Sequence, residues 1–255
     1  MSISVPHALS VWWRNAAMYR RTWKANILPN FFEPVFYLAG IGLGVGAYIQ
    51  EMGGTSYARF LAPGLVCVAA MNGASFEATY NIFVRLTWEK TYDAMLTTPV
   101  EPDDVLCGEL LWALTRACIY GGAFFVVLMA FGLAPLPNAL LALPAIPLAG
   151  LLFSALGIAF SLRVTKIDFL SFYFTLFLTP LFLFSDVFFP IHERLSGGWL
   201  WVAEALPLLH PVRFARSAFA GQFGWRMFWD VAYVLVVSAL LLALARRTIH
   251  RRLTA

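Results

Sequence analysis

The chain has 255 residues, of which 60% are hydrophobic and 13% are charged, with a formal net charge of +4. A soluble domain carries roughly twice that share of charge, so the composition excludes an ordinary soluble enzyme or binding module. The basic residues stand at the ends of apolar runs, which argues against a nucleic-acid partner. Long apolar runs without alternation predict transmembrane helices, not a β-barrel. We therefore expect an all-α polytopic membrane protein with one domain over residues 1–255.

Residues 1–29 are predicted to lie on the cytoplasmic side of the membrane. Between Ser10 and Lys24, aromatic residues recur at helical spacing on one side, and basic residues occupy the other positions. Tryptophan and tyrosine favour the headgroup zone and basic residues favour anionic lipid, so this segment should form an amphipathic helix in the membrane plane. The residues assigned to this interfacial helix are Trp12, Arg20, Arg21 and Trp23. A loosely ordered basic tail is the alternative.

Six membrane spans are predicted, because six apolar runs meet or approach the roughly 20 residues that a bilayer requires. They are Phe31–Gln50, Tyr57–Val84, Val105–Leu133, Asn138–Leu162, Asp168–Phe189 and Met227–Ala245. Glu77 should face protein or water, since a carboxylate that faces lipid is costly. Arg116 is expected to extend its side chain to the cytoplasmic interface, and a buried, substrate-binding charge is the alternative. Asp186 is the most unusual charge in any span, and Pro180 should bend the fifth span.

The loop 85–104 is a charged segment between the second and third spans. Its apolar residues can share one side of a short helix that ends before Pro99. These apolar residues are Leu86, Tyr92, Met95 and Leu96. Glu101–Asp104 should begin the next helix, since proline suits the first turn and carboxylates favour its positive end. A short amphipathic helix flush with the membrane suits receiving force from a soluble partner. An ordinary cytoplasmic loop resting on lipid is the alternative.

The segment 192–224 is too interrupted by glycine and proline to span a membrane, and two short helical pieces are expected in Ser196–Gly221. They either lie on the outer surface or dip into the membrane and return, which requires packing against protein. With the N-terminus inside, lysine and arginine are more frequent in the cytoplasmic segments than in the outer ones. Both termini are therefore predicted to be cytoplasmic.

Catalytic and metal-binding signatures are missing from the sequence. No glycine immediately precedes a lysine, so there is no phosphate-binding P-loop, and no HExxH pattern occurs. Cys67, Cys107 and Cys118 show no metal-ligand spacing and are expected to fill apolar space. We predict neither a catalytic residue nor a metal site. Any pumping would then draw its energy from a partner or from an ion gradient.

The segment Tyr92–Leu111, YDAMLTTPVEPDDVLCGELL, resembles the cytoplasmic loop of ABC-2 type transporter permeases. Phe177–Ile191 and Leu206–Gly221 are similar to later segments of that family, and within it the chain most resembles the subunits for nodulation-factor (lipo-oligosaccharide) export. The resemblance implies a homodimer bound to two copies of a separate ATP-binding subunit, which would hold ATP and magnesium. No cofactor is expected on this chain, and its location would be the bacterial inner membrane.

The resemblance also assigns roles to segments and residues. It implies a coupling helix over Leu86–Leu96 between spans two and three, and a re-entrant helical pair over Trp199–Ala220 between spans five and six. The residues expected to couple to the ATPase are Arg85, Leu86, Glu89, Lys90, Tyr92, Asp93, Met95 and Leu96. The candidates for a translocation pathway or gate are Glu77, Phe169, Tyr173, Phe177, Asp186, Phe189, Leu206 and His210. Asp186 departs from the family pattern, where a small residue such as glycine is expected.

The predicted function is a permease subunit that exports a lipid-linked substrate, a glycolipid or lipo-oligosaccharide, or another amphipathic molecule, without an ATPase site of its own. A drug or natural-product efflux permease is the alternative within the family. An ion-gradient-driven secondary transporter is a rival, although it would normally show paired ionisable groups or broken helices at the midplane. A membrane scaffold or assembly subunit and an integral-membrane enzyme are further rivals. The expected partners are the ATPase, a second permease copy and membrane lipids.

Overall fold

The computed structural model describes residues 3–44, 48–49, 51–52, 54–134, 136–191 and 197–253, with the side chains of 24–34 and 41–43 excepted. The elements in chain order are α1 (Val5–Leu43), strands β1 (Glu51–Met52) and β2 (Thr55–Ser56), α2 (Tyr57–Phe76), π-helices η2 (Glu77–Asn81) and η3 (Val84–Trp88), α3 (Thr91–Met95), α4 (Pro102–Ala130), α5 (Asn138–Leu141), α6 (Ala145–Ser161), α7 (Asp168–Phe172), π-helix η4 (Tyr173–Leu178), α8 (Thr179–Phe184), α10 (Trp199–Glu204), α11 (Leu209–Phe219) and α12 (Trp225–Leu253). The two strands pair antiparallel, with Glu51 opposite Ser56.

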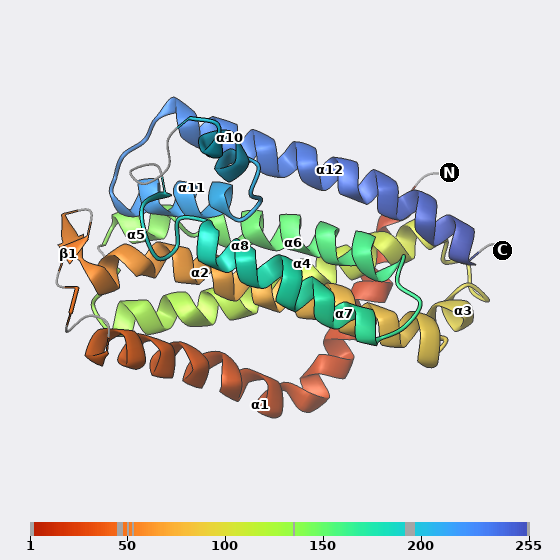
Figure 1. Cartoon of the computed structure of the whole chain (residues 1–255). Helices are drawn as coiled ribbons and strands as arrows, with labels where there is room; N and C mark the ends of the chain where they lie inside the picture. The colour runs from red at the N-terminus through yellow and green to blue at the C-terminus, as the bar shows by residue number, and fades with distance from the viewer. Residues whose placement is uncertain are drawn as a thin grey trace.

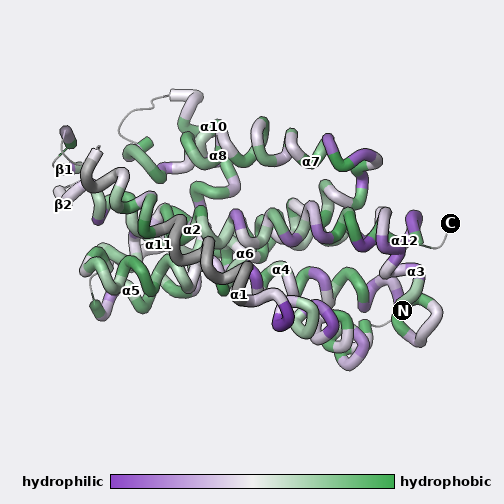
Figure 2. Tube along the Cα trace, turned by 90° about the horizontal axis from the view of Figure 1, so that it is seen from below, coloured by the Kyte–Doolittle hydropathy of each residue, from purple (hydrophilic) through white to green (hydrophobic). Residues whose placement is uncertain are grey.

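The long helices lie side by side as a bundle (Figure 1). Both chain termini and α3 lie at one end of this bundle, and the β1–β2 hairpin lies at the other. Hydrophobic residues dominate the length of the helices, and hydrophilic residues gather toward the end that carries α3 and the C-terminus (Figure 2). Among the described residues, four helices are long and apolar enough to cross a membrane: Tyr57–Trp88, Pro102–Ala130, Asn138–Ser161 and Trp225–Leu253. This finding confirms a helical membrane protein.

The helix that starts at Tyr57 is the centre of the bundle, and α12 lies at its edge. In the most apolar part of each helix, 83% of the residues of Tyr57–Trp88 are buried, against 22% for α12. Gly157 of α6 permits close contact with this central helix, since a Cβ at Gly157 would lie 2.7 Å from the Ala78 Cβ. Close packing of this kind holds helices together in lipid, where the hydrophobic effect does not favour helix association.

The predicted interfacial helix and first span are joined in the structure. They form one helix, α1, which bends along its course (Figure 1). Pro29 and Pro34 lie inside α1, and an interior proline removes a backbone hydrogen bond and commonly bends a helix. The predicted boundary between residues 1–29 and Phe31–Gln50 is therefore a bend and not a break. Gln50 itself lies outside the described residues.

The second span continues further than predicted, to Trp88, through two π-helical turns. The helix cannot continue past Lys90, because the φ of this residue, 53°, is in the left-handed region. The prediction of one coupling helix over Leu86–Leu96 is therefore wrong. Leu86 belongs to the long helix, and the separate helix α3 comprises only Thr91–Met95.

The helix of the third span begins at Glu101–Asp104, as predicted. Glu101 is the N-cap of α4, Pro102 is in its first turn, and the Glu101 amide donates a hydrogen bond of 3.1 Å to the Asp104 carboxylate. The Asp104 side chain thus pairs with one of the backbone N–H groups that the start of a helix leaves without a partner.

The later spans differ from prediction mainly at their ends. Asn138–Leu162 consists of α5 and α6, with Pro144 between them. The fifth helix runs from Asp168 to Phe184 and stops before the predicted Phe189, because Asp186 has a φ of 60°. The turn before Pro180 is π-helical, so the proline is accommodated by a wider turn. The last helix, α12, extends beyond Met227–Ala245 and includes the terminal arginines.

The segment 192–224 contains the two predicted short helices, α10 and α11, while residues 192–196 lie outside the described residues. Helix α11 is buried against α2: the Cys67 thiol donates a 3.3 Å hydrogen bond to the Pro211 carbonyl. Trp199 and Trp201 of α10 are exposed. The two pieces therefore differ, since α11 is part of the core and α10 covers the surface.

Candidate functional site

The segment between η3 and α4 presents charged residues at the end of the bundle that carries both chain termini. Glu89, Lys90 and Asp93 are exposed, and Met95 and Leu96 are half-buried. Trp88, which the sequence reasoning did not assign to the site, is 62% exposed. An exposed tryptophan beside charged residues is a common component of protein interfaces. These residues form the accessible part of the predicted coupling surface.

Three residues predicted to face the ATPase lie in the interior instead. Leu86 and Tyr92 are buried, and Arg85 directs its guanidinium at two buried carboxylates. The expectation of a direct contact with a partner is therefore corrected for Arg85, Leu86 and Tyr92. The physical reason is that the helix before Lys90 is longer than predicted, so its last turns pack within the bundle.

Arg85 is the centre of a buried charge cluster that consists of Glu77, Arg85, Glu109 and Arg116. Its Nη2 donates to Glu77 over 2.7 Å, and its Nη1 donates to Glu109 over 2.6 Å. Both carboxylates are almost completely buried, Glu77 at 3% and Glu109 at 2% exposure. Charge-assisted hydrogen bonds of this length are the strong ones, and buried charges require them. Glu77 thus faces protein, as predicted.

Arg116 is the second cation of this cluster and does not reach the interface. It is 4% exposed, its Nε lies 3.6 Å from the Glu77 carboxylate, and its Nη2 donates to the Tyr120 hydroxyl. Its guanidinium also lies over the ring of Tyr19, 4.4 Å from the centroid. The expectation that Arg116 extends to the headgroups is therefore wrong, since these aromatic and acidic neighbours hold it inside the bundle.

Tyr92 connects α3 with the charge cluster. It is 1% exposed, and its buried hydroxyl has no hydrogen-bond partner among the described residues. Burial and the adjacent negative charge of Glu109 raise the pKa of the Tyr92 phenol well above its ordinary value. The phenol therefore stays neutral.

The first half of α1 packs on α4. Trp12 Nε1 donates a 3.0 Å hydrogen bond to the Thr115 hydroxyl. A Cβ at Gly108 would lie 2.5 Å from the Val11 Cβ, so only glycine permits this approach of the two helices. Arg20, Arg21 and Trp23 are exposed, whereas Trp12 is half-buried. Of the four residues assigned to the interfacial helix, Trp12 is the one that contacts α4.

The start of α4 also holds both ends of the described chain. The Asp103 carboxylate accepts hydrogen bonds from Arg246 at 2.7 and 2.8 Å and lies 2.8 Å from His250 Nε2. The neighbouring Asp104 accepts a 2.7 Å hydrogen bond from the Ser4 amide of α1. We refer to this group of contacts as the terminal clasp. It fixes α1 and α12 beside the turn that carries α3.

A polar cavity of about 270 Å³ lies between α1, the end of the second span and α4. Its lining residues are Arg14, Asn15, Met18, Tyr19, Thr22, Glu77, Asn81, Val84, Arg85, Glu89, Trp112 and Arg116. Sequence reasoning missed this cavity, because it requires residues of α1 and α4 that are about 100 positions apart to face one another.

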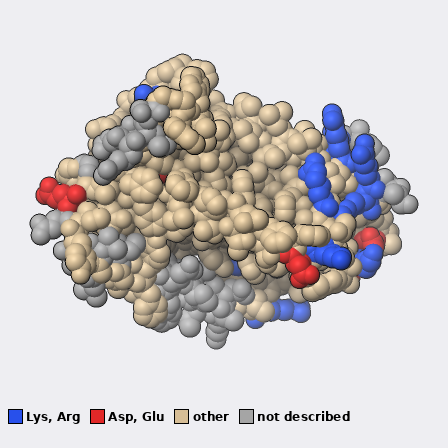
Figure 3. All heavy atoms as spheres, in the orientation of Figure 1, with Lys and Arg blue, Asp and Glu red and all other residues tan. Residues whose placement is uncertain are grey.

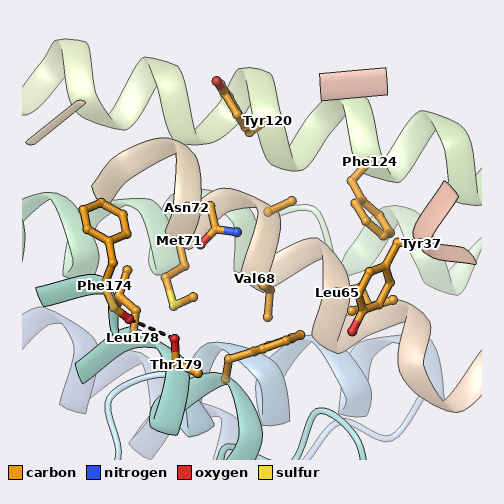
Figure 4. A pocket seen from close by; sticks show the side chains of 12 residues that line it. Tyr37, Leu65, Val68, Met71, Asn72, Tyr120, Phe124, Phe174, Leu178 and Thr179 are labelled. Carbon is orange, nitrogen blue, oxygen red and sulfur yellow. Dashed lines mark hydrogen bonds between the residues drawn. The ribbon is translucent and has the colours of Figure 1, made fainter. Parts of the chain in front are cut away.

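A second cavity of about 270 Å³ is mainly apolar and lies among α1, α2, α4 and the fifth helix (Figure 4). Tyr37, Phe124 and Phe174 come to it from three different helices, and Asn72 and Thr179 are polar residues on its wall (Figure 4). None of the predicted pathway residues is in the lining of this cavity. An apolar space with a few polar groups suits an acyl chain or another amphipathic molecule.

The predicted pathway residues are instead dispersed through the structure. Phe169 is exposed on α7, and Phe177, Phe189 and Leu206 are half-buried. Tyr173 is buried, with its hydroxyl 3.3 Å from the Ser75 hydroxyl. Glu77 belongs to the charge cluster described above. These residues therefore do not form one site.

Asp186 and His210 belong to two ion-pair groups at the hairpin end of the bundle. Asp186 lies 3.2 Å from Arg216 Nε and accepts a 2.9 Å hydrogen bond from the Ile191 amide. Its φ of 60° explains why glycine would suit this position, and aspartate is one of the few other residues that adopt it. His210 Nδ1 lies 2.8 Å from the Asp230 carboxylate, which also binds Arg213. Both groups connect α11 with its neighbours.

Within the described residues, no group of three His, Cys, Asp or Glu side chains is arranged to hold a metal ion. Cys67, Cys107 and Cys118 are free.

Lysine and arginine side chains gather at the end of the molecule that carries α3 and the C-terminus (Figure 3). The exposed basic residues of the α6–α7 turn and of the C-terminal end of α12 are Arg163, Lys166, Arg246, Arg247, Arg251 and Arg252.

Comparison with known proteins gives consistent results. The model of the family described as ABC-2 type transporter matches residues 7–220. Nodulation protein J of Rhizobium leguminosarum bv. viciae is 36% identical over 214 residues, which cover 84% of this chain and 82% of that protein. Nodulation protein J of Sinorhizobium fredii is 33% identical over 96% of this chain and 93% of its own length. The inner membrane transport permease YadH of Escherichia coli is 22% identical over 91% of this chain and 93% of its own length.

Proposed function

This chain belongs to the ABC-2 type transporter family, and from that premise we propose that it is the permease subunit of an exporter for a lipid-linked or glycolipid substrate. Members of the family are transmembrane subunits that work with a separate ATPase. The observation that carries the proposal is the accessible surface around α3, which follows Arg85 of the buried charge cluster in the chain. ATP and magnesium would be bound by the partner subunit, and this chain supplies the path and the coupling surface.

The proposed topology has six spans with both termini in the cytoplasm of a bacterial inner membrane. Four spans are the long apolar helices described above. The second half of α1 and the shorter apolar helix Asp168–Phe184 would be the other two. The concentration of arginine and lysine at the α3 end supports a cytoplasmic placement of that end. Helices α10 and α11 would then form the outer re-entrant pair, with α11 packed against protein as a non-spanning segment requires.

In the proposed complex, two permease copies bind two ATPase subunits through α3 and its flanking residues. ATP changes the transporter only if the two conformations bind the partner differently, and that difference must act through this small surface. Glu89, Lys90 and Asp93 offer charge, and Trp88 and Met95 offer apolar area. Tyr92 would pass a displacement of α3 to Glu109 in α4.

The proposed substrate is amphipathic, such as a lipo-oligosaccharide. The apolar cavity of Figure 4 supports this proposal, since its lining suits an acyl chain and its Asn72 and Thr179 suit a polar group. The name of the relatives, Nodulation protein J, agrees with the resemblance to nodulation-factor exporters. An apolar drug or natural product would fit the same lining, so an efflux permease is the second candidate.

The test is Met95→Asp in a tagged chain expressed in its native host. Charge at this half-buried position should abolish co-purification of an ATPase at roughly equal stoichiometry, while the permease still inserts. Phe223→Asp is the matched control, because Phe223 is an exposed aromatic residue in the α11–α12 turn, and this variant should keep the ATPase bound. Equal recovery of the ATPase with both variants would contradict the assignment of α3. A host in which the wild-type chain transports with no bound ATPase would contradict the function itself.

A further inference from the structure

The polar cavity contains hydrogen-bond donors that the described protein atoms do not use. Arg116 Nε and Nη1 and the Tyr19 hydroxyl are buried and have no hydrogen-bond partner among those atoms, although Arg116 Nε lies 3.6 Å from Glu77. All three atoms belong to residues that line the cavity. Buried donors in proteins are normally paired, so a group of them around one space points to a ligand with oxygen acceptors.

The charges around the cavity favour an anion. Arg14, Arg85 and Arg116 bring three positive charges, and the buried carboxylates of Glu77 and Glu109 bring two negative ones. Arg85 is already hydrogen-bonded to both carboxylates. Arg14 donates to Asn15 and Thr91, and Arg116 donates to Tyr120, so neither of these two lining cations is hydrogen-bonded to a carboxylate among the described residues. Glu89 also lines the cavity, but it is exposed, and solvent screens its charge.

The mouth of the cavity lies where a lipid headgroup would reach it. Met18 and Thr22 of α1 are exposed lining residues, and Arg21 and Trp23 on the same stretch of the helix are exposed as well. Basic and aromatic side chains together are typical of a helix at the headgroup level. Trp112, which is buried, forms an apolar wall of the space.

We propose that the polar cavity binds one phosphate group of an anionic membrane lipid, with Arg116 and the Tyr19 hydroxyl as its donors and Arg14 at the rim. Guanidinium is the side-chain group best suited to phosphate, and here it is held in place by the rings of Tyr19 and Tyr120. The polar and the apolar cavity share no lining residue, although Tyr120, which holds Arg116, lines the apolar cavity. The proposal does not depend on the identity of the exported substrate.

The experiment is native mass spectrometry of the purified full chain in detergent with three probes: phosphatidylglycerol, dioleoylglycerol and inorganic phosphate. Phosphatidylglycerol should bind with a stoichiometry of one per chain, and dioleoylglycerol, which lacks the phosphate, should not. Arg116→Met should lower the affinity by about tenfold or more, since it removes a charge-assisted hydrogen bond. Tyr19→Phe should lower it about threefold. Arg59→Met, at an exposed position of α2 at the hairpin end of the bundle, is the matched control and should leave the affinity unchanged.

Each outcome decides the proposal. If Arg116→Met does not accumulate, Tyr19→Phe still tests the site, because the hydroxyl that it removes has no hydrogen-bond partner among the described residues. Displacement of the lipid by millimolar inorganic phosphate would show that the cavity also takes the free anion, and lack of displacement would show that it requires the lipid. Equal binding of phosphatidylglycerol by the wild type and by Tyr19→Phe and Arg116→Met would overturn the proposal. So would equal binding of dioleoylglycerol.

Discussion

Replacement of Arg85 by methionine is the most direct test of the buried charge cluster. Methionine has similar length but removes both hydrogen bonds, at 2.6 Å to Glu109 and 2.7 Å to Glu77. Breaking one buried ion pair by removal of a partner costs about 3–5 kcal/mol, because the remaining charge is left uncompensated. Glu77 keeps Arg116 at 3.6 Å and a hydrogen bond from Asn81, so most of the cost should come from Glu109. We expect a loss of about 4 kcal/mol.

Thermal unfolding of the purified permease in detergent measures this effect. For a chain of this size, 1 kcal/mol corresponds to about 2–4 °C in the midpoint, so Arg85→Met should lower the midpoint by roughly 12 °C. A second variant, Arg85→Met with Glu109→Gln, removes the stranded charge and should recover at least half of the loss, because the coupling between the two positions is large. If Arg85→Met shifted the midpoint by less than about 2 °C, or if the double variant were less stable than the single one, the assignment of a strong buried ion pair would be incorrect.

Three further predictions concern positions where the packing is specific. Gly108→Leu should push α1 away from α4, since even a Cβ would lie 2.5 Å from the Val11 Cβ, and limited proteolysis should then cut within the first half of α1; an unchanged digestion pattern would contradict the close contact. Asp186→Ala should be less stable than Asp186→Gly by about 1 kcal/mol, because both lose the ion pair with Arg216 but only glycine adopts a φ of 60° without strain; equal melting midpoints would contradict this. Asp103→Asn should speed amide hydrogen exchange at the C-terminal end of α12, and unchanged exchange there would show that the clasp carries no stability.

The local signals in the sequence predicted the local structure. The start of α4 was predictable from Glu101, Pro102 and Asp104, because helix capping depends on residues within one turn. The long apolar runs likewise predicted four helices that, among the described residues, are long and apolar enough to cross a membrane, since bilayer thickness sets a minimum length. The interruption of the chain between α8 and α12 followed from its glycine and proline residues in the same way.

What the sequence could not predict depends on residues brought together by packing. Arg116 was expected at the interface because its distance from the end of the span allows that position, and nothing near it in the sequence indicates Glu77 or Tyr19 as neighbours. Arg85 was assigned to the coupling surface for a related reason, since the end of the second span was placed too early. Lys90 ends that helix with a left-handed torsion, which is uncommon for lysine and therefore gives no sequence signal.

The pathway residues show a further limit of sequence reasoning. They were chosen as charged or aromatic residues in apolar runs, yet the structure places Asp186 and His210 in ion pairs with Arg216 and Asp230. The residues that line the apolar cavity include Val68 and Leu178, which are ordinary residues for any apolar span. Whether such a residue lines a cavity depends on how the helices pack, and the amino-acid composition does not predict that packing.

The terminal clasp has a practical consequence for work on this protein. Since Asp103 and Asp104 hold α12 and the first residues of α1 at the start of α4, a probe attached to either end of the chain would report on the neighbourhood of α3. A pair of fluorophores at the two ends would therefore monitor the α3 end of the bundle, which we propose faces the cytoplasm and the ATPase. Bulky fusion proteins at those ends would crowd the same face, so short and flexible attachments are preferable.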